Sequence, residues 1–253
     1  MSGLGTSPDA GAGPLLRVEG IHTYRGAAHV LHGVSLTVGR AESVCLVGRN
    51  GAGKTTTIES VMGLLGTRQG RVFLGAQEVT RLAAHQRARL GLGYAPEDAG
   101  VFPDLTVSEN FQISQALAEV AGRSAPRDPA TDVDLRVFSL FPEVRQFLGR
   151  RGLNLSGGQK KMVAIARALT LSPAVLLLDE PFEGLAPVVV SRFIEAARQI
   201  KSLGISLLIA ESNLATASRI ADRLYAMDRG EVIFEGGPAA AQADPEVMRT
   251  LRG

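Results

Sequence analysis

Residues 48–56, Gly-Arg-Asn-Gly-Ala-Gly-Lys-Thr-Thr, constrain the fold more than any other stretch of the chain. They match the pattern G-x-x-x-x-G-K-[ST], and they follow an apolar run at Ser43–Val47 that is typical of a buried strand. The next segment, Thr56–Met62, is typical of the start of a helix. Glycines between a strand and a helix let backbone N–H groups turn inward around phosphates, and the helix N-terminus adds partial positive charge. The pattern therefore predicts a site for a nucleoside triphosphate.

This phosphate loop has an expected division of roles. The predicted nucleotide-binding residues are Gly48, Arg49, Asn50, Gly51, Ala52, Gly53, Lys54, Thr55 and Thr56. Lys54 is expected to reach the β- and γ-phosphates, and the Thr55 hydroxyl is expected to hold Mg²⁺. A chance glycine-rich turn is the alternative explanation, and the flanking strand and helix argue against it.

An acidic pair follows the apolar run Ala174–Leu178, which is typical of a central parallel strand. In a fold with a phosphate loop, a carboxylate at the C-terminal end of a strand can hold the water shell of Mg²⁺, and a second carboxylate can orient the attacking water. We therefore expect Asp179 to be a metal ligand and Glu180 to be catalytic together with Lys54. Two solvated acids at a strand end are the alternative explanation.

A second glycine pair, in Leu-Ser-Gly-Gly-Gln at residues 155–159, opens a predicted helix at Lys160–Leu169. Glycines before a helix expose its amides to an anion, and a serine hydroxyl adds a further donor. The predicted anion-binding residues are Ser156, Gly157, Gly158 and Gln159. Because the phosphate loop already supplies one site, this second one is expected to serve a γ-phosphate that another subunit holds.

Strand-like and helix-like segments alternate along the chain. Strands are predicted at Leu15–Ile21, Gly33–Val38 and Ile205–Ala210, with a hairpin over residues 224–234. Residues from about 97 to 160 are predicted to form a helical subdomain between strand-bearing parts. The alternation predicts an α/β fold with a mostly parallel sheet and helices on both faces.

Two helices can be predicted in more detail. Val79–Leu90 is rich in arginine and amphipathic, which is typical of a surface helix. Thr106 and Glu109 have the spacing of a capping box, which predicts a helix that runs to about Val120. We find no internal repeat.

The composition limits the classes of function. The 253 residues include 27 Lys and Arg against 25 Asp and Glu, so the formal net charge of +2 gives no argument for nucleic acid as a partner. The single cysteine, Cys45, is expected to be a small buried core residue. No apolar run approaches the about 20 residues that span a bilayer, so another chain would do the spanning. Residues 1–14 are predicted to be a disordered tail before a single domain over residues 15–253.

The three motifs together resemble the ATP-binding cassette of ABC proteins, from residue 15 to about residue 240. The resemblance implies the P-loop NTPase fold of the ABC cassette, with an antiparallel N-terminal β part and an inserted α-helical subdomain. It implies binding of ATP and Mg²⁺, and ATP hydrolysis that powers transport. Two such cassettes, in a homo- or heterodimer, would close head to tail at the cytoplasmic face of the cell membrane, against transmembrane permease subunits.

The resemblance also implies roles for residues that the motifs alone do not identify. Tyr24 would stack on the adenine ring. Glu97 would lie near Mg²⁺ in the loop Tyr94–Asp98 that links the two lobes, at a position where most cassettes carry glutamine. Glu183–Leu185 would cross the interface between two cassettes.

Finer features are similar to the branched-chain amino-acid uptake subfamily, the LivF-type cassettes. They are Gly48-Arg49-Asn50, Pro96-Glu97, the stretch from Phe102 to Val107, and the stretch from Glu183 to Pro187. Related amide and urea uptake cassettes share many of these residues. The similarity implies import of small solutes, most of all branched-chain amino acids, with a solute-binding protein as an indirect partner.

One departure from the family pattern concerns Ser212, which falls where most cassettes carry a histidine that contacts the γ-phosphate. The four histidines, at positions 22, 29, 32 and 85, all come early in the chain. Ser212 is kept as a catalytic candidate, but serine is shorter than histidine, so slow hydrolysis is expected.

Two other functions fit parts of the sequence. Ser212 favours a regulatory cassette that binds ATP but hydrolyses it little without a sister ATPase, whereas the intact Lys54, Asp179 and Glu180 argue against it. An ABC protein that acts on nucleic acid or ribosomes would carry two cassettes or a basic arm, and this sequence shows neither.

Overall fold

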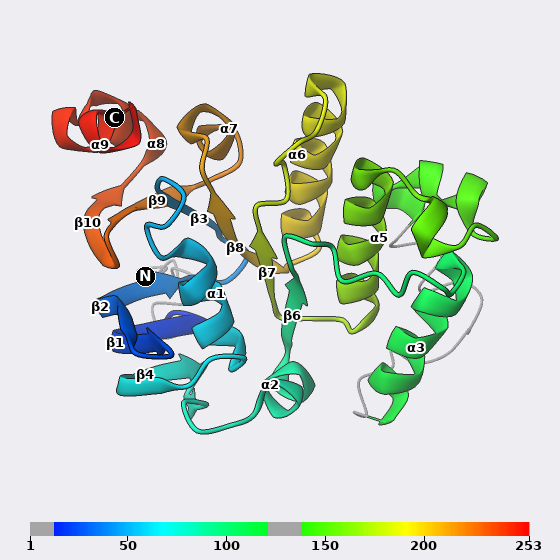
Figure 1. The fold of residues 1–253 in the computed structure, drawn as a ribbon, viewed down its shortest axis with the longest axis horizontal. Coiled ribbons are helices and arrows are strands. Elements are labelled where there is room, and N and C mark those ends of the chain that lie inside the picture. The colour runs from blue at the N-terminus through cyan, green and yellow to red at the C-terminus, as the bar shows by residue number, and fades with distance from the viewer. Residues whose placement is uncertain (1–12, 121–137, 253) are drawn as a thin grey trace, which may run out of the picture.

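The computed structural model describes residues 13–120 and 138–252 (Figure 1). Residues 1–12 of the predicted N-terminal tail lie outside this range. Among the described residues, four strands form an antiparallel sheet in the order β2-β1-β4-β5 and six form a second sheet in the order β10-β9-β3-β8-β7-β6. The strands of the first sheet are β1 Leu16–Arg25, β2 Ala28–Val38, β4 Thr67–Leu74 and β5 Gln77–Glu78.

The second sheet is parallel except at one edge. Its strands are β3 Ser43–Val47, β6 Leu92–Ala95, β7 Val175–Asp179, β8 Ser206–Glu211, β9 Arg223–Asp228 and β10 Glu231–Gly236. β9, β3, β8, β7 and β6 pair in parallel, while β10 returns antiparallel to β9 through a tight turn. The predicted mostly parallel core, the antiparallel N-terminal part and the C-terminal hairpin are confirmed.

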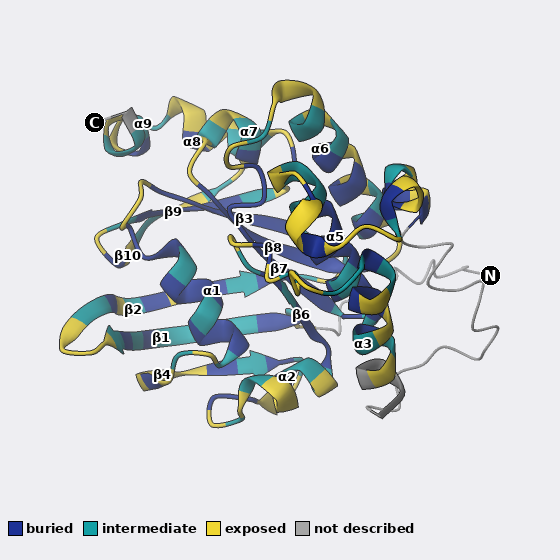
Figure 2. Ribbon diagram, turned by 45° about the vertical axis from the view of Figure 1, so that its right-hand side comes forward, coloured by how far each residue is buried: buried dark blue, intermediate teal, exposed yellow. Residues whose placement is uncertain are grey.

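Helices cover both faces of the parallel sheet (Figures 1 and 2). Their bounds are α1 Lys54–Met62, α2 Ala84–Leu90, α3 Val107–Val120, α5 Gly157–Thr170, α6 Pro187–Ser202, α7 Leu214–Ser218, α8 Pro238–Ala243 and α9 Pro245–Arg252, with short 3-10 helices η1 Pro142–Phe147 and η2 Gly152–Asn154. None of these helices is long and apolar enough to cross a membrane, within the residues that the structure describes.

Strand β3 explains the layering, because successive side chains of a strand point to opposite faces. Val44 and Leu46 belong to the core that α1 shares with the antiparallel sheet. Cys45 and Val47 belong to the core that includes residues of α5 and α6. All four side chains are fully buried, so β3 reads as an unbroken apolar run, and the predicted core role of Cys45 is confirmed.

Between β6 and β7 the described chain is helical, on the right of Figure 1. Helix α3 begins after the predicted capping box: the Thr106 hydroxyl accepts a bond from the Glu109 amide, and the Glu109 carboxylate accepts one from the Thr106 amide at 2.7 Å. Helix α5 packs against α3 and β6. It runs from Gly157 to Thr170, so the predicted helix at Lys160–Leu169 is confirmed and extends three residues further toward the N-terminus.

The predicted surface helix at Val79–Leu90 is wrong in its first five residues. The Val79 amide bonds to the Val72 carbonyl oxygen at 2.8 Å, and helix α2 begins only at Ala84. The amphipathic pattern is also misleading at Arg87, which is 2% exposed. Its guanidinium donates to four backbone carbonyl oxygens at 2.7–3.0 Å, those of Ser60, Val61, Thr80 and Leu82.

Replacing Arg87 with leucine is expected to lower the free energy of unfolding by about 2–4 kcal/mol, because it leaves buried carbonyl groups without donors. The measurement is urea denaturation, with Arg89→Leu as the matched control. Arg89 lies on the same helix and is exposed, so its loss is expected to cost less than about 0.5 kcal/mol. Equal stability of the two variants would contradict this role of Arg87.

Candidate functional site

The phosphate loop folds into a cradle because of its glycines. Gly51 and Gly53 have φ angles of 84° and 108°, a left-handed backbone that residues with a side chain rarely adopt. A Cβ on Gly48 would lie 2.7 Å from the backbone oxygen of Met227, so that position is closed to larger residues. At Gly51, by contrast, a Cβ would meet nothing within 4 Å, which leaves open space above the loop. The loop thus offers backbone N–H groups to a phosphate-sized group.

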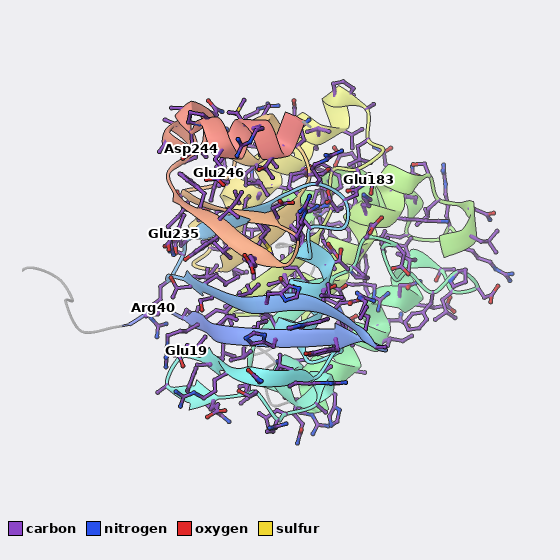
Figure 3. All side chains as sticks on the ribbon, turned by 60° about the vertical axis from the view of Figure 1, so that its left-hand side comes forward. Glu19, Arg40, Glu183, Glu235, Asp244 and Glu246 are labelled. Atoms are coloured by element: carbon purple, nitrogen blue, oxygen red, sulfur yellow. The ribbon has the colours of Figure 1, made fainter. Side chains whose placement is uncertain are left out.

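A pocket of about 420 Å³ lies above this cradle. Its lining comes from segments far apart in the sequence: Arg25, Val30, Asn50, Gly51, Gly53, Lys54, Thr55, Thr56, Glu97, Glu180 and Glu183. Sequence analysis predicted most of these residues, although it gave no role to Arg25 or Val30. Asp244 and Glu246 do not belong to this lining, and Figure 3 shows them well apart from Glu183.

The Lys54 side chain is the central cation of the pocket. It is 4% exposed, and its Nζ lies 3.0 Å from the Glu180 Oε1 atom. The same Nζ donates to the backbone oxygens of Gly48 at 2.8 Å and Arg49 at 3.2 Å. Two buried opposite charges are stable together only when paired and further hydrogen-bonded, as they are here. The structure therefore joins the two residues predicted to bind phosphate and activate water.

Thr55 and Asp179 meet beside this ion pair. The Thr55 hydroxyl donates to the Asp179 Oδ1 atom at 3.0 Å. Burial raises the pKa of Asp179 to about 6, while the bond from Thr55 opposes the rise. A hydroxyl and a carboxylate are the hard oxygen ligands that Mg²⁺ takes alongside nucleotide phosphates, so the pair fits that ion.

Glu180 is held in an unusual conformation directly after β7. Its φ angle is 43°, in the left-handed region, and its amide donates to the Ala210 carbonyl at 3.0 Å. Its Oε2 atom accepts bonds from the Ser212 amide at 3.1 Å and the Ser212 hydroxyl at 3.3 Å. Ser212, a catalytic candidate at the position where most cassettes carry histidine, thus contacts the Glu180 carboxylate in this structure.

Residues 156–159 lie at the start of α5 and do not line the pocket of their own chain. Ser156 caps the helix: its hydroxyl accepts from the Gln159 amide at 3.3 Å, and the Gln159 side chain accepts from the Ser156 amide at 3.0 Å. Ser156 and Gly157 are exposed. A role for this segment toward a second subunit stays a prediction.

Tyr24 also lies outside the lining of the pocket. Its ring stacks on the His29 ring, with centroids 4.2 Å apart and planes within 2°, and the Arg68 guanidinium carbon lies 3.9 Å from its ring centroid. Two side chains of the same chain therefore contact the ring already, and adenine stacking by Tyr24 stays a prediction.

Two further acidic residues belong to this region: Glu97, which was predicted to lie near Mg²⁺, and Glu211, to which the sequence analysis gave no role. Burial raises the pKa of Glu97, and a hydrogen bond and the charge of Glu183 add to the effect. Glu211, the last residue of β8, is 3% exposed, and burial raises its pKa to about 7. The sequence did offer a signal for Glu211, because this acidic residue ends a predicted buried strand, as Asp179 does.

The chain matches the family described as ABC transporter over residues 31–183, which is more than half of its length. The chain belongs to the ABC transporter family. Its members include ATP-binding subunits that work as dimers with transmembrane permease components. The predicted ATP-binding cassette and its ATPase activity are therefore confirmed at the level of the family.

Individual proteins agree with this assignment. The chain is 34% identical to the lipopolysaccharide export system ATP-binding protein LptB of Haemophilus influenzae, over 94% of this chain and 97% of that protein. It is 32% identical to the high-affinity branched-chain amino acid transport ATP-binding protein BraG of Pseudomonas aeruginosa, over 94% of this chain and 100% of that protein. A solved ATP-binding cassette of an ABC transporter, in its ADP conformation, matches with a TM-score of 0.80 and 28% identity, and the match covers 95% of this chain and 99% of that one.

Glu211 should make the stability of this cassette depend on pH. Its pKa in the folded chain, about 7, lies above its ordinary value of 4.5, so its favourable contribution is complete below pH 4.5 and is lost as the pH rises through 7. Glu211→Gln should remove this part of the pH dependence and be more stable at pH 8 by about 1–3 kcal/mol.

The measurement is urea denaturation of both proteins at pH 5 and at pH 8. Glu231→Gln, at an exposed position on β10, is the control and should follow the wild type. A Glu211→Gln variant whose stability changes with pH as the wild type does would contradict the assigned cause.

Proposed function

We propose that this ABC ATPase is the motor subunit of a small-solute importer that carries branched-chain amino acids. The observation that carries the motor role is the buried contact of 3.0 Å between Lys54 and Glu180 at the phosphate loop. Similarity to BraG over the whole length of that protein supports the substrate class. The proposal places the chain at the cytoplasmic face of the membrane, as a peripheral subunit.

Each polar group of the pocket has a proposed task. Lys54 binds the β- and γ-phosphates, and Thr55 and Asp179 hold Mg²⁺, which neutralises phosphate charge when bound. Glu180 orients and deprotonates the attacking water, and Ser212 keeps the Glu180 carboxylate in place through its two bonds. Glu97 lies in the lining where it can approach the ion.

A second cassette completes the site. Residues Ser156–Gly158 at the exposed start of α5 bind the γ-phosphate of the partner, since amides at a helix N-terminus attract anions. The partner is a second copy or a sister chain. The permease subunits dock near Tyr94–Phe102, a stretch that includes the linking loop and in which Phe102 is 42% exposed. A solute-binding protein delivers the solute to the permease.

Two alternatives have specific support. Similarity to LptB favours an exporter of lipopolysaccharide. The chain is 34% identical to LptB and 32% identical to BraG, so the two relatives are about equally similar. The serine at position 212 favours a regulatory cassette that needs a sister ATPase. Amide or urea uptake is a further variant of the importer proposal.

Uptake of radiolabelled leucine, isoleucine and valine tests the proposal in cells that lack this protein. The wild type should restore uptake, whereas Glu180→Gln should not, because it removes the base that activates water. Uptake that is unaffected by the deletion would contradict the amino-acid substrate. Loss of lipopolysaccharide from the cell surface in the same deletion strain would favour export instead.

Ser212→His should raise the rate of ATP hydrolysis by roughly tenfold, because histidine can add the γ-phosphate contact that serine is too short to make. The bond from the backbone amide of residue 212 to Glu180 does not depend on the side chain, so it continues to hold the carboxylate. The measurement is phosphate release by the purified protein at saturating ATP. Ser202→His, on the exposed C-terminal end of α6, is the control and should leave the rate unchanged. An unchanged or lower rate for Ser212→His would contradict the idea that this position limits turnover.

A further inference from the structure

Lys161 makes a contact that none of the motifs predicts. It lies on α5, two residues after Gln159, and its side chain is half-buried. Its Nζ atom donates to the backbone oxygen of Glu180 at 2.6 Å and to the backbone oxygen of Glu183 at 3.0 Å. One ammonium group thus connects α5 to both ends of the segment 180–183, which follows β7.

The first of these two oxygens belongs to Glu180, which has a left-handed backbone conformation. Glu180 adopts a φ of 43° although it is not glycine, and such a conformation persists only where the surroundings hold it. Its amide is held by Ala210 on β8, at 3.0 Å. Its carbonyl is held by Lys161. The residue is therefore fixed from two sides, and the direction of its carboxylate follows from that fixation.

The acidic neighbours explain why a cation suits this position. Glu97, Glu180 and Glu183 all attract the Lys161 ammonium group, which otherwise loses hydration by burial. Lys160, the preceding residue, offers a contrast: its side chain makes no hydrogen bond or ion pair with the described part of the chain, although its amide continues the helix. The contact to Glu180 is specific to one of two adjacent lysines.

We propose that Lys161 is a positioning residue for hydrolysis, which holds the Glu180 peptide so that its carboxylate points at the attacking water. The inference rests on the proposed role of Glu180. Lys161 follows the Ser156–Gln159 segment on the same helix. It therefore also connects the segment proposed to bind the partner's ATP to Glu180, which acts on the ATP of its own chain.

The experiment compares three variants of the purified full chain. Lys161→Met keeps the length of the side chain but removes the donor. Lys161→Arg keeps a charged donor, and Lys160→Met is the matched control on the same helix. For each protein, kcat and KM for ATP hydrolysis, the dissociation constant for ATP and the melting temperature are measured.

Lys161→Met should lower kcat at least about tenfold, because small misplacements of a reacting group are costly, with ATP affinity within about twofold of the wild type. Lys161→Arg should recover most of the lost rate, and Lys160→Met should match the wild type. A kcat of Lys161→Met within about twofold of the wild type would overturn the proposal. So would a loss of rate that comes with an equal loss of ATP affinity or melting temperature, since a merely structural role predicts that result.

The failure of this inference can be told apart from the failure of the proposed function. Glu180→Gln is measured beside the other variants. If it hydrolyses ATP as fast as the wild type, the role of Glu180 is wrong, and the proposal for Lys161 falls with it. If it is inactive while Lys161→Met is fully active, only the positioning role of Lys161 is overturned.

Discussion

The buried ion pair between Lys54 and Glu180 is the interaction on which the rest of the site depends. Neither charge could stay buried without the other, so the phosphate loop after β3 and the acidic pair after β7 must meet. The strand order achieves this, because β8 lies between β3 and β7 and its own C-terminal end supplies Ser212. Parallel strands bring their carboxyl ends to one edge, which is where ligands bind in α/β sheets. The site is thus a consequence of the sheet topology.

Local sequence patterns predicted the parts of this arrangement that depend on local physics. The apolar runs that became β3, β7 and β8 and the capping box of α3 were recognisable, because burial and caps leave a direct mark on the sequence. Strand β6 was missed, since four residues with a glycine among them carry little periodicity. Arg87 was predicted to lie on the surface because helical periodicity does not reveal the backbone carbonyl groups near the end of α1 that its guanidinium contacts.

The contacts of the site that join distant segments of the chain could not be predicted from the sequence. The motifs located Lys54, Thr55, Asp179 and Glu180, whereas the bond from Lys161 to the Glu180 carbonyl requires the packing of α5 against the end of β7. The contact of Tyr24 with His29 depends on irregular register between β1 and β2, which no alternation pattern reveals. The residues of the pocket act on ATP and therefore support the motor role. The transported solute can be inferred only from the similarity to BraG or LptB.

The nucleotide that Glu180→Gln retains tests the central claim most directly. The purified variant is incubated with ATP and Mg²⁺, separated from free nucleotide, and its bound nucleotide is identified by chromatography. If Glu180 activates the attacking water, the variant should hold intact ATP while the wild type under the same conditions converts it to ADP at a rate at least about a hundredfold higher. ADP formed by the variant at the rate of the wild type would contradict the account.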